Sequence, residues 1–169
     1  MAVEPAVQID PTIPEATFKS VLSRFCTGVT VITALAGDQP VGFSCQSFSS
    51  LSLDPPAIAF FPARTSTSWP RIREVGRFCV NILAHDQADI CRALARSGTD
   101  KFASVDWVVS GNGAPRLTGA LATIECELDR EIDGGDHTIV IARVTALSEH
   151  SEQPPLLFYR AAFERLHGH

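Results

Sequence analysis

The sequence lacks a surplus of positive charge and lacks any long apolar run. Its 169 residues carry a formal net charge of -5 and contain no basic stretch. Nucleic-acid binding needs a clustered basic surface, so nucleic acid is not an expected partner. No apolar run approaches the roughly 20 residues that cross a bilayer. Residues 1–16 lack the basic and apolar regions of a signal peptide. We therefore expect a cytoplasmic protein with no membrane partner.

Metal-binding and disulfide patterns are also missing. The five cysteines include no C-x-x-C pair, and no cluster of Cys, His and acidic residues has zinc-ligand spacing. No metal is expected. Cys26, Cys79 and Cys126 each lie in or beside an apolar segment. We interpret them as small buried hydrophobic residues in a reducing compartment.

The common nucleotide-binding and hydrolase fingerprints are missing too. The stretch nearest to a Rossmann fingerprint, "GNGAPR" from Gly111, lacks the third glycine and follows no strong strand. There is no Walker A pattern and no G-x-S-x-G elbow. A dinucleotide fold of the Rossmann type is therefore not expected.

What the sequence does contain is a series of short β-branched segments separated by turn residues. These segments run in hairpins and do not alternate with helices, which predicts a mainly β, mostly antiparallel barrel. Residues 1–14 resemble a loose N-terminal arm, and residues 15–169 form one domain. Strands are predicted at 29–36, 41–45, 55–63, 77–84 and 154–160, a long hairpin at 119–149, and short helices at 17–28, 66–76 and 86–98. In the last two helices, Gly76 and Gly98 are the expected ends and Asp86 is an expected cap.

The long hairpin has two different strands. Apolar and polar residues alternate from Ala120 to Asp129, which predicts one buried and one solvated face. The return strand, Thr138 to Leu147, is apolar on both faces. Something must cover its outer side, and a subunit interface is one possibility.

Four segments could carry chemistry. Ser44–Ser52 is dense in hydroxyls and could line a polar planar ring such as a flavin or a pyrimidine, although an edge strand or solvated loop would have the same composition. Ala63–Pro70 places hydroxyls before a helix start, where phosphate binds, or where they simply cap the helix. Lys101 could pair with a phosphate or be solvated. His137 follows a tight glycine turn and could be functional, structural or merely exposed.

Taken in order, the motifs resemble the short-chain flavin reductases, the reductase components of two-component flavin-dependent monooxygenases. The motifs are "FCTGVTVIT", "PVGFSCQSFSSLSLDPP", "SWPRI", "GRFCVNIL", "DKF", "GGDHTIVIARV" and "PLLFYR". The resemblance extends from Phe18 to Arg160. It is strongest to the reductases of actinobacterial secosteroid hydroxylases and of antibiotic-tailoring hydroxylases. Cys45 and Gln46 depart from the family's commonest residues.

This resemblance implies an FMN-binding split β-barrel with a Greek-key core, built as a homodimer with flavin near the interface. It implies hydride transfer from NAD(P)H to FAD or FMN, and delivery of reduced flavin to a monooxygenase. NADH is the expected donor because no arginine cluster lies near His137 in the sequence. The alternative is a flavin- or pyridoxal-phosphate-binding barrel without activity.

The resemblance also implies roles for individual residues. His137 would contact the nicotinamide nucleotide. The flavin ring would lie against Ser44, Cys45, Gln46 and Ser47. The residues implied at the flavin phosphate, or packed beside it, are Ser66, Thr67, Ser68, Trp69, Lys101 and Phe102.

Overall fold

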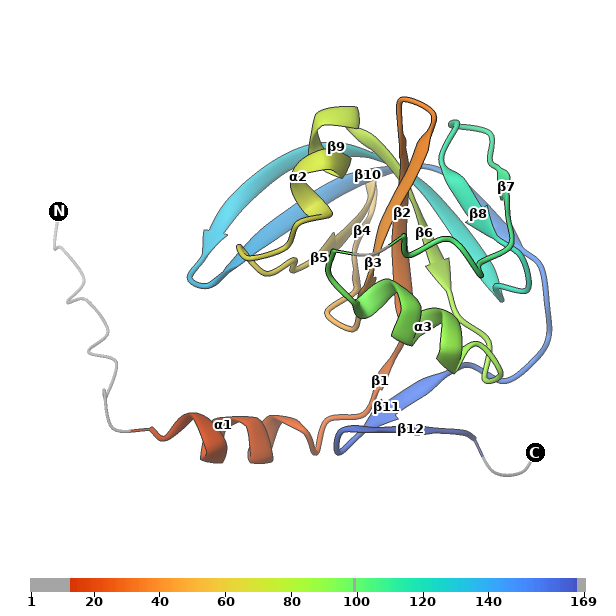
Figure 1. Cartoon of the computed structure of the whole chain (residues 1–169). Helices are drawn as coiled ribbons and strands as arrows, with labels where there is room; N and C mark the ends of the chain where they lie inside the picture. Colours follow the sequence, from red (N-terminus) through yellow and green to blue (C-terminus); the bar gives the residue numbers. More distant parts are fainter. Residues whose placement is uncertain (1–12, 99, 167–169) are drawn as a thin grey trace, which may run out of the picture.

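Most of the regular secondary structure is antiparallel β-strand, as the hairpin-rich sequence predicts (Figure 1). The computed structural model describes residues 13–98 and 100–166. The helices are α1 (Glu15–Leu22), α2 (Trp69–Val75) and α3 (Ala88–Ala95). The strands are β1 (Thr27–Gly28), β2 (Thr30–Ala36), β3 (Gln39–Cys45), β4 (Ser49–Leu53), β5 (Pro56–Phe60), β6 (Arg77–Ile82), β7 (Trp107–Val109), β8 (Pro115–Leu117), β9 (Ala122–Gly134), β10 (His137–Glu149), β11 (Leu157–Tyr159) and β12 (Ala162–Glu164). No helix within these ranges is long and apolar enough to cross a membrane.

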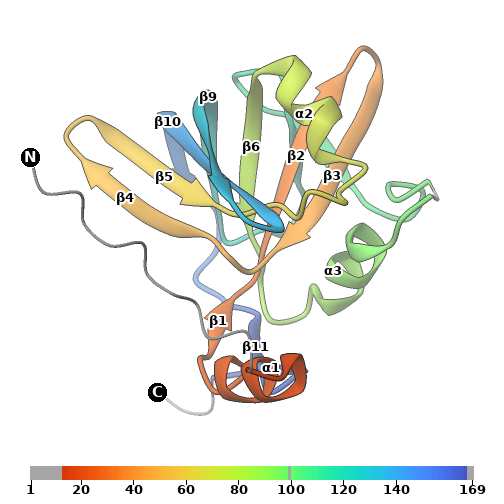
Figure 2. The ribbon, with the colours of Figure 1, turned by 90° about the vertical axis from the view of Figure 1, so that its left-hand side faces the viewer.

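Seven strands form the main sheet in the order β3-β2-β6-β9-β10-β5-β4. The two edge strands, β3 and β4, are consecutive in the chain but do not pair with each other. Figure 2 shows the sheet curving, with β2 and β3 on one side and β4 and β5 on the other. Helix α1 lies with β1 and β11 at one end of the molecule, away from the main sheet (Figure 1, Figure 2).

Two apolar clusters support this arrangement. In the first, Phe60, Trp69 and Phe78 pack edge to face inside the curved sheet, with ring centroids 5.4 Å apart for Phe60–Trp69 and 5.5 Å for Phe60–Phe78. The second cluster packs α3 against β2 through Val31 and Leu94, both of which are fully buried. The first cluster fixes the start of α2 and the second fixes α3, so both helices have defined positions beside the end of β3.

The long hairpin agrees with its prediction. Strands β9 and β10 pair along their length, and a turn at Gly135 and Asp136 joins them. The β9 alternation holds except at Thr123, which is buried where a solvated residue was expected. Gly76 ends α2 in the left-handed conformation, as predicted.

The first predicted helix is too long. Helix α1 ends at Leu22, and Thr27–Gly28 pairs with β11 as a strand, so Gly28 does not end the helix. Phe25, inside the predicted helix, has 77% of its surface exposed, and Cys26 is exposed although it was predicted to be buried. The reason is tertiary, because pairing with β11 favours an extended backbone over local helix propensity.

Other boundaries also differ from the predictions. Helix α3 begins after Gln87 rather than Asp86 and ends at Ala95 before Gly98. The "GNGAPR" stretch lies in a small unpredicted hairpin, β7–β8. That hairpin is attached to the sheet by the buried side chain of Asn81, which accepts a hydrogen bond of 2.8 Å from the Leu117 backbone N–H. Apart from residues 13 and 14, the predicted arm lies outside the described residues.

Candidate active site

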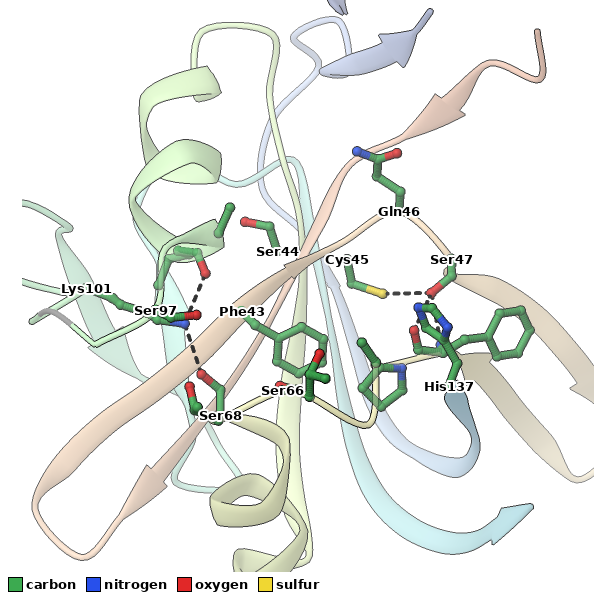
Figure 3. Close-up of a pocket in the computed structure, with 17 residues that line it drawn as sticks. Phe43, Ser44, Cys45, Gln46, Ser47, Ser66, Ser68, Ser97, Lys101 and His137 are labelled. Carbon is green, nitrogen blue, oxygen red and sulfur yellow. Dashed lines mark hydrogen bonds between the residues drawn. The ribbon is translucent and has the colours of Figure 1, made fainter. Parts of the chain in front are cut away.

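A cavity of about 440 Å³ collects most of the predicted site residues. Its wall comes from the end of β3, the segment after β5, the end of α3 with the loop that follows it, and the first residue of β10. Figure 3 shows Lys101 and Ser68 at one end of the cavity and Ser47 and His137 at the other. Nine of the predicted residues share this wall: Ser44, Cys45, Gln46, Ser47, Ser66, Thr67, Ser68, Lys101 and His137.

The end formed by β3 is polar but uncharged. Ser47 fixes the chain after β3 to Phe61, because its Oγ accepts a 2.9 Å hydrogen bond from the Phe61 N–H and lies 3.2 Å from the Phe61 carbonyl oxygen. The Cys45 Sγ lies 3.2 Å from the same Ser47 Oγ. Burial raises the pKa of the Cys45 thiol, so the thiol stays neutral near pH 7. Ser44 donates to the Cys91 carbonyl at 2.7 Å and so attaches α3 to this wall.

The opposite end holds a cation without an anionic partner. The Lys101 ammonium lies 3.0 Å from Ser68 Oγ and 3.3 Å from the carbonyl oxygens of Gly42 and Leu94. No carboxylate among the residues described here lies within 4.0 Å of it. Partial burial lowers the pKa of Lys101, because desolvation disfavours the charged form. A half-buried ammonium bonded only to neutral groups is suited to an anionic ligand.

The serines before α2 have different roles. Ser66 Oγ accepts a 3.1 Å hydrogen bond from the Trp69 N–H, so this hydroxyl caps the helix start, which was the alternative considered for it. Ser68 is buried against Lys101, and Thr67 is exposed. The segment therefore combines a structural hydroxyl with others that face the cavity.

His137 is held by its neighbours at the mouth of the cavity. Its Nδ1 lies 2.8 Å from Asp136 Oδ1, and this hydrogen bond lowers the pKa of the Asp136 carboxyl. The residues before and after His137 in the chain make backbone hydrogen bonds to the segment after β5. The Thr138 N–H donates to the Pro62 carbonyl and the Arg64 N–H donates to the Asp136 carbonyl, both at 2.9 Å. The histidine backbone is thus fixed to the segment that follows β5.

A second set of contacts fixes the turn itself. Asp133 Oδ1 accepts hydrogen bonds from the Gly135 N–H at 2.9 Å and from Arg64 Nη2 at 2.7 Å. These two bonds, the backbone one first, lower the pKa of Asp133. We call these contacts among Arg64, Asp133 and Gly135 the turn clamp. In the sequence only the glycine turn pointed to it, since Arg64 lies 69 residues before Asp133 in the chain.

Two predicted residues do not line this cavity. Trp69 is 4% exposed in the core, and its Nε1 donates to Glu131 at 2.7 Å. Phe102 is buried and lines a neighbouring cavity instead. Conversely, Phe43 and Phe61 line the first cavity and were not predicted to, because alternation within a strand does not distinguish core from cavity wall.

Comparison with known proteins places this cavity in context. The flavin reductase like domain matches residues 22–167. Over 146 residues the chain is 51% identical to the reductase subunit HsaB of a flavin-dependent monooxygenase from Rhodococcus jostii, covering 86% of this chain and 75% of that protein.

Two solved structures share the architecture. Nitrilotriacetate monooxygenase component B from Mycobacterium thermoresistibile superimposes with a TM-score of 0.88 at 46% identity, over 90% of this chain and 87% of that one. The Streptomyces globisporus NADH:FAD oxidoreductase SgcE6, in complex with NAD and FAD fragments, gives 0.87 at 33% identity, over 94% and 96%.

Proposed function

This chain belongs to the flavin reductase like domain family, and we propose that it passes a hydride from NADH to a flavin in the cavity beside His137. The chemistry comes from the two nucleotides, since the nicotinamide supplies the hydride and the flavin ring accepts it. The protein binds both, orients them and excludes water. The fold is the family's split barrel, with β3 and β4 as the unpaired edges.

The residues of the cavity fit a flavin. Its volume of about 440 Å³ lies within the usual range for small-molecule sites. Backbone groups and hydroxyls at Ser44–Ser47 offer neutral donors and acceptors to a polar ring. At the far end, Lys101 and Ser68 offer a cation and a hydroxyl to a phosphate. This match of a neutral end with a cationic end is the observation that carries the proposal.

His137 serves the nicotinamide side. The Asp136 carboxylate can only accept a hydrogen bond, so Nδ1 of the imidazole carries the shared proton. Nε2 is then the ring nitrogen left for a ligand. An imidazole held in one tautomer and one position can hydrogen-bond a nicotinamide nucleotide without itself taking part in proton transfer.

NADH is the hydride donor that fits the end of the cavity formed by His137. An NADP-specific site needs an arginine free to bind the 2′-phosphate. Arg64 lies close to His137 in the folded structure, but its guanidinium is paired with Asp133. The prediction of NADH therefore agrees with the observed pairing.

We also propose that the protein is a cytoplasmic homodimer. Helix α1 buries none of its residues in the isolated chain. Phe18, Val21, Leu22 and Phe25 are all more than half exposed, and Leu147 on β10 is 70% exposed. An amphipathic helix without a packing surface needs a cover, and a second copy of the chain would supply one.

The acceptor of the reduced flavin is a partner monooxygenase. The Rhodococcus relative is named as the reductase subunit of such an enzyme. Thr65 and Thr67 on the cavity wall are exposed, so the cavity is open to solvent, which allows reduced flavin to leave and reach a second protein.

A spectrophotometric assay tests the proposal. Purified protein should oxidise NADH, followed at the nicotinamide absorbance band, only when FAD or FMN is added. Protein that binds flavin but leaves NADH oxidation at the uncatalysed rate would be the non-catalytic binding module that the sequence left open.

A further inference from the structure

The Ser47 hydroxyl takes the place of a backbone partner where the β4–β5 ladder ends. In that ladder Ser49 lies opposite Ala59, and the same register continued by two residues places Ser47 opposite Phe61. The Phe61 N–H donates to Ser47 Oγ at 2.9 Å, and Oγ donates to the Phe61 carbonyl at 3.2 Å. Because a side chain supplies both bonds, the backbone groups of Phe61 stay paired although β4 begins only at Ser49.

This hydroxyl has no capacity left for a ligand. A serine hydroxyl has one proton to donate and two lone pairs that accept. The Phe61 carbonyl takes the proton and the Phe61 N–H takes one lone pair. The neutral Cys45 thiol, 3.2 Å away, donates to the other lone pair (Figure 3). The Ser44 hydroxyl, which donates to the Cys91 carbonyl, keeps lone pairs for the flavin ring, whereas Ser47 can offer the ring only its backbone.

Phe61 leads directly into the segment that holds His137. The next residue, Pro62, accepts a hydrogen bond of 2.9 Å from the Thr138 N–H. Ala63 then forms an antiparallel β-bridge with His137 itself. A displacement of Phe61 would therefore be passed to the imidazole through the backbone.

The Ser47 hydroxyl joins this segment to the β3 side of the cavity. Among the hydrogen bonds of the described residues, only the two at Ser47 Oγ connect residues 46–48 with residues 61–64. Under the proposed function, the flavin ring lies on the β3 side and the nicotinamide lies beside His137. The hydroxyl thus fixes the separation between the two surfaces that hold the reacting rings.

We propose that Ser47 is a positioning residue for hydride transfer, whose hydroxyl sets the alignment of the two nucleotides without contacting either ring. This rests on the proposed function, because it takes both nucleotides to bind in this cavity. In the transfer a C–H bond of NADH breaks, and the hydrogen with both electrons forms an N–H bond on the flavin ring, so NADH is oxidised and flavin is reduced. A misplacement of about 1 Å can slow such a step about 100-fold. Loss of the hydroxyl should slow the step more than it weakens binding.

Stopped-flow mixing of FMN-saturated protein with NADH, without oxygen, measures the step directly. At saturating NADH, flavin reduction in Ser47→Ala should be about 10- to 100-fold slower than in the unmodified protein. The dissociation constant for FMN, from fluorescence quenching, and the NADH concentration that gives half the maximal rate should change less than about twofold. Ser47→Thr keeps the hydroxyl and should restore most of the rate.

Ser49→Ala is the matched control. Ser49 is exposed, its Oγ donates to the Ser50 carbonyl at 3.0 Å, and it does not line the cavity. Its loss should leave the rate of flavin reduction unchanged.

The other outcomes separate the alternatives. An unchanged rate in Ser47→Ala, or a rate equally low in Ser47→Thr, would overturn the proposal. FMN affinity that falls as much as the rate would make Ser47 a flavin contact and overturn it too. A fall in Tm with parallel loss of rate and affinity would show a merely structural role. Failure of the unmodified protein to reduce FMN with NADH would instead refute the proposed function.

Discussion

Gly42 is the residue on which the wall between the two cavities depends. A Cβ atom at this position would lie 2.9 Å from the Ile32 carbonyl oxygen and 3.1 Å from the Phe102 ring. Only a residue without a side chain lets Phe102 pack directly on β3. Phe102 in turn follows Lys101 in the chain, so the position of the unpaired ammonium depends on this close contact.

Gly42→Ala should therefore destabilise the fold. Overpacking of this kind costs about 1–3 kcal/mol, and the Ile32 contact is with backbone that cannot rotate away. Gly28→Ala is the matched control, because nothing lies within 4 Å of a Cβ at Gly28. Urea unfolding monitored by tryptophan fluorescence gives both free energies of unfolding. Equal values for the two variants would show that the wall yields to the added methyl group.

His137→Ala should impair NADH use more than flavin binding. Loss of a hydrogen bond to a charged or strongly polar group costs roughly 1.5–3 kcal/mol, which is about 10- to 150-fold in kcat/KM for NADH. Flavin affinity, measured separately by fluorescence quenching, should change much less. A variant that binds flavin poorly but keeps its NADH kinetics at saturating flavin would assign His137 to the flavin site or to the turn.

Lys101 makes a pH-dependent prediction. Burial lowers its pKa from the ordinary value of 10.5, so the ammonium loses its proton at a lower pH than an exposed lysine. FMN affinity should consequently fall as the pH rises toward the lowered pKa of Lys101, because the phosphate loses its cationic partner. Riboflavin has the same ring but no phosphate, and its affinity serves as the control at each pH. Parallel loss of both affinities would show that Lys101 does not hold the phosphate.

The sequence could identify single residues only where their neighbours along the chain carried the signal. His137 stands out because glycines precede it, and the structure places it on the cavity wall. Arg64 could not be distinguished from other exposed arginines, since its partner Asp133 lies 69 residues later in the chain. Tryptophan is common in cofactor sites, but Trp69 lies in the core, where it packs against Phe60 and Phe78.

At the scale of elements, the β9–β10 turn is held by an exposed clamp. Arg64 and Asp133 are both more than half exposed, and ion pairs of this kind contribute about 0–1 kcal/mol to stability. The clamp therefore matters for the position of His137 more than for the free energy of unfolding.

Asp133→Ala should separate these two effects. We expect kcat/KM for NADH to fall about three- to tenfold, since hydride transfer depends on alignment of the bound nucleotides, while Tm changes little. Asp129→Ala removes a paired aspartate from the same strand away from the turn and should leave the kinetics unchanged. A large drop in Tm with Asp133→Ala would mean that the clamp is part of the folding core.

Element types were predictable where a segment's own pattern agreed with its tertiary contacts. The hairpins β2–β3 and β9–β10 have β-branched runs joined by turn residues, and both form as predicted. The predicted end of helix α1 was wrong because Thr27–Gly28 pairs with β11, which lies far along the chain. The small β7–β8 hairpin has too short a pattern to be visible without its anchor at Asn81.

At the scale of the molecule, the exposed face of α1 predicts a dimer. Light scattering at micromolar concentration should give twice the chain mass of 18.2 kDa. Phe18→Asp combined with Leu22→Asp places two charges on this face and should shift the mass toward that of one chain. Val109→Asp, at an exposed apolar residue on β7, should not. A monomer in the unmodified protein would contradict the proposed interface.

The order of strands has a consequence for how the protein is synthesised. The first half of the chain supplies β2, β3 and β6 on one side and β4 and β5 on the other, and these two groups do not touch in the sheet order. The β9–β10 hairpin inserts between them, pairing with β6 on one flank and β5 on the other. A growing chain on the ribosome thus carries two half-sheets with open edges, which are prone to misassociation, until the residues of β10 emerge. The cavity is likewise incomplete until then, because His137, the residue proposed for the nicotinamide side, is the first residue of β10.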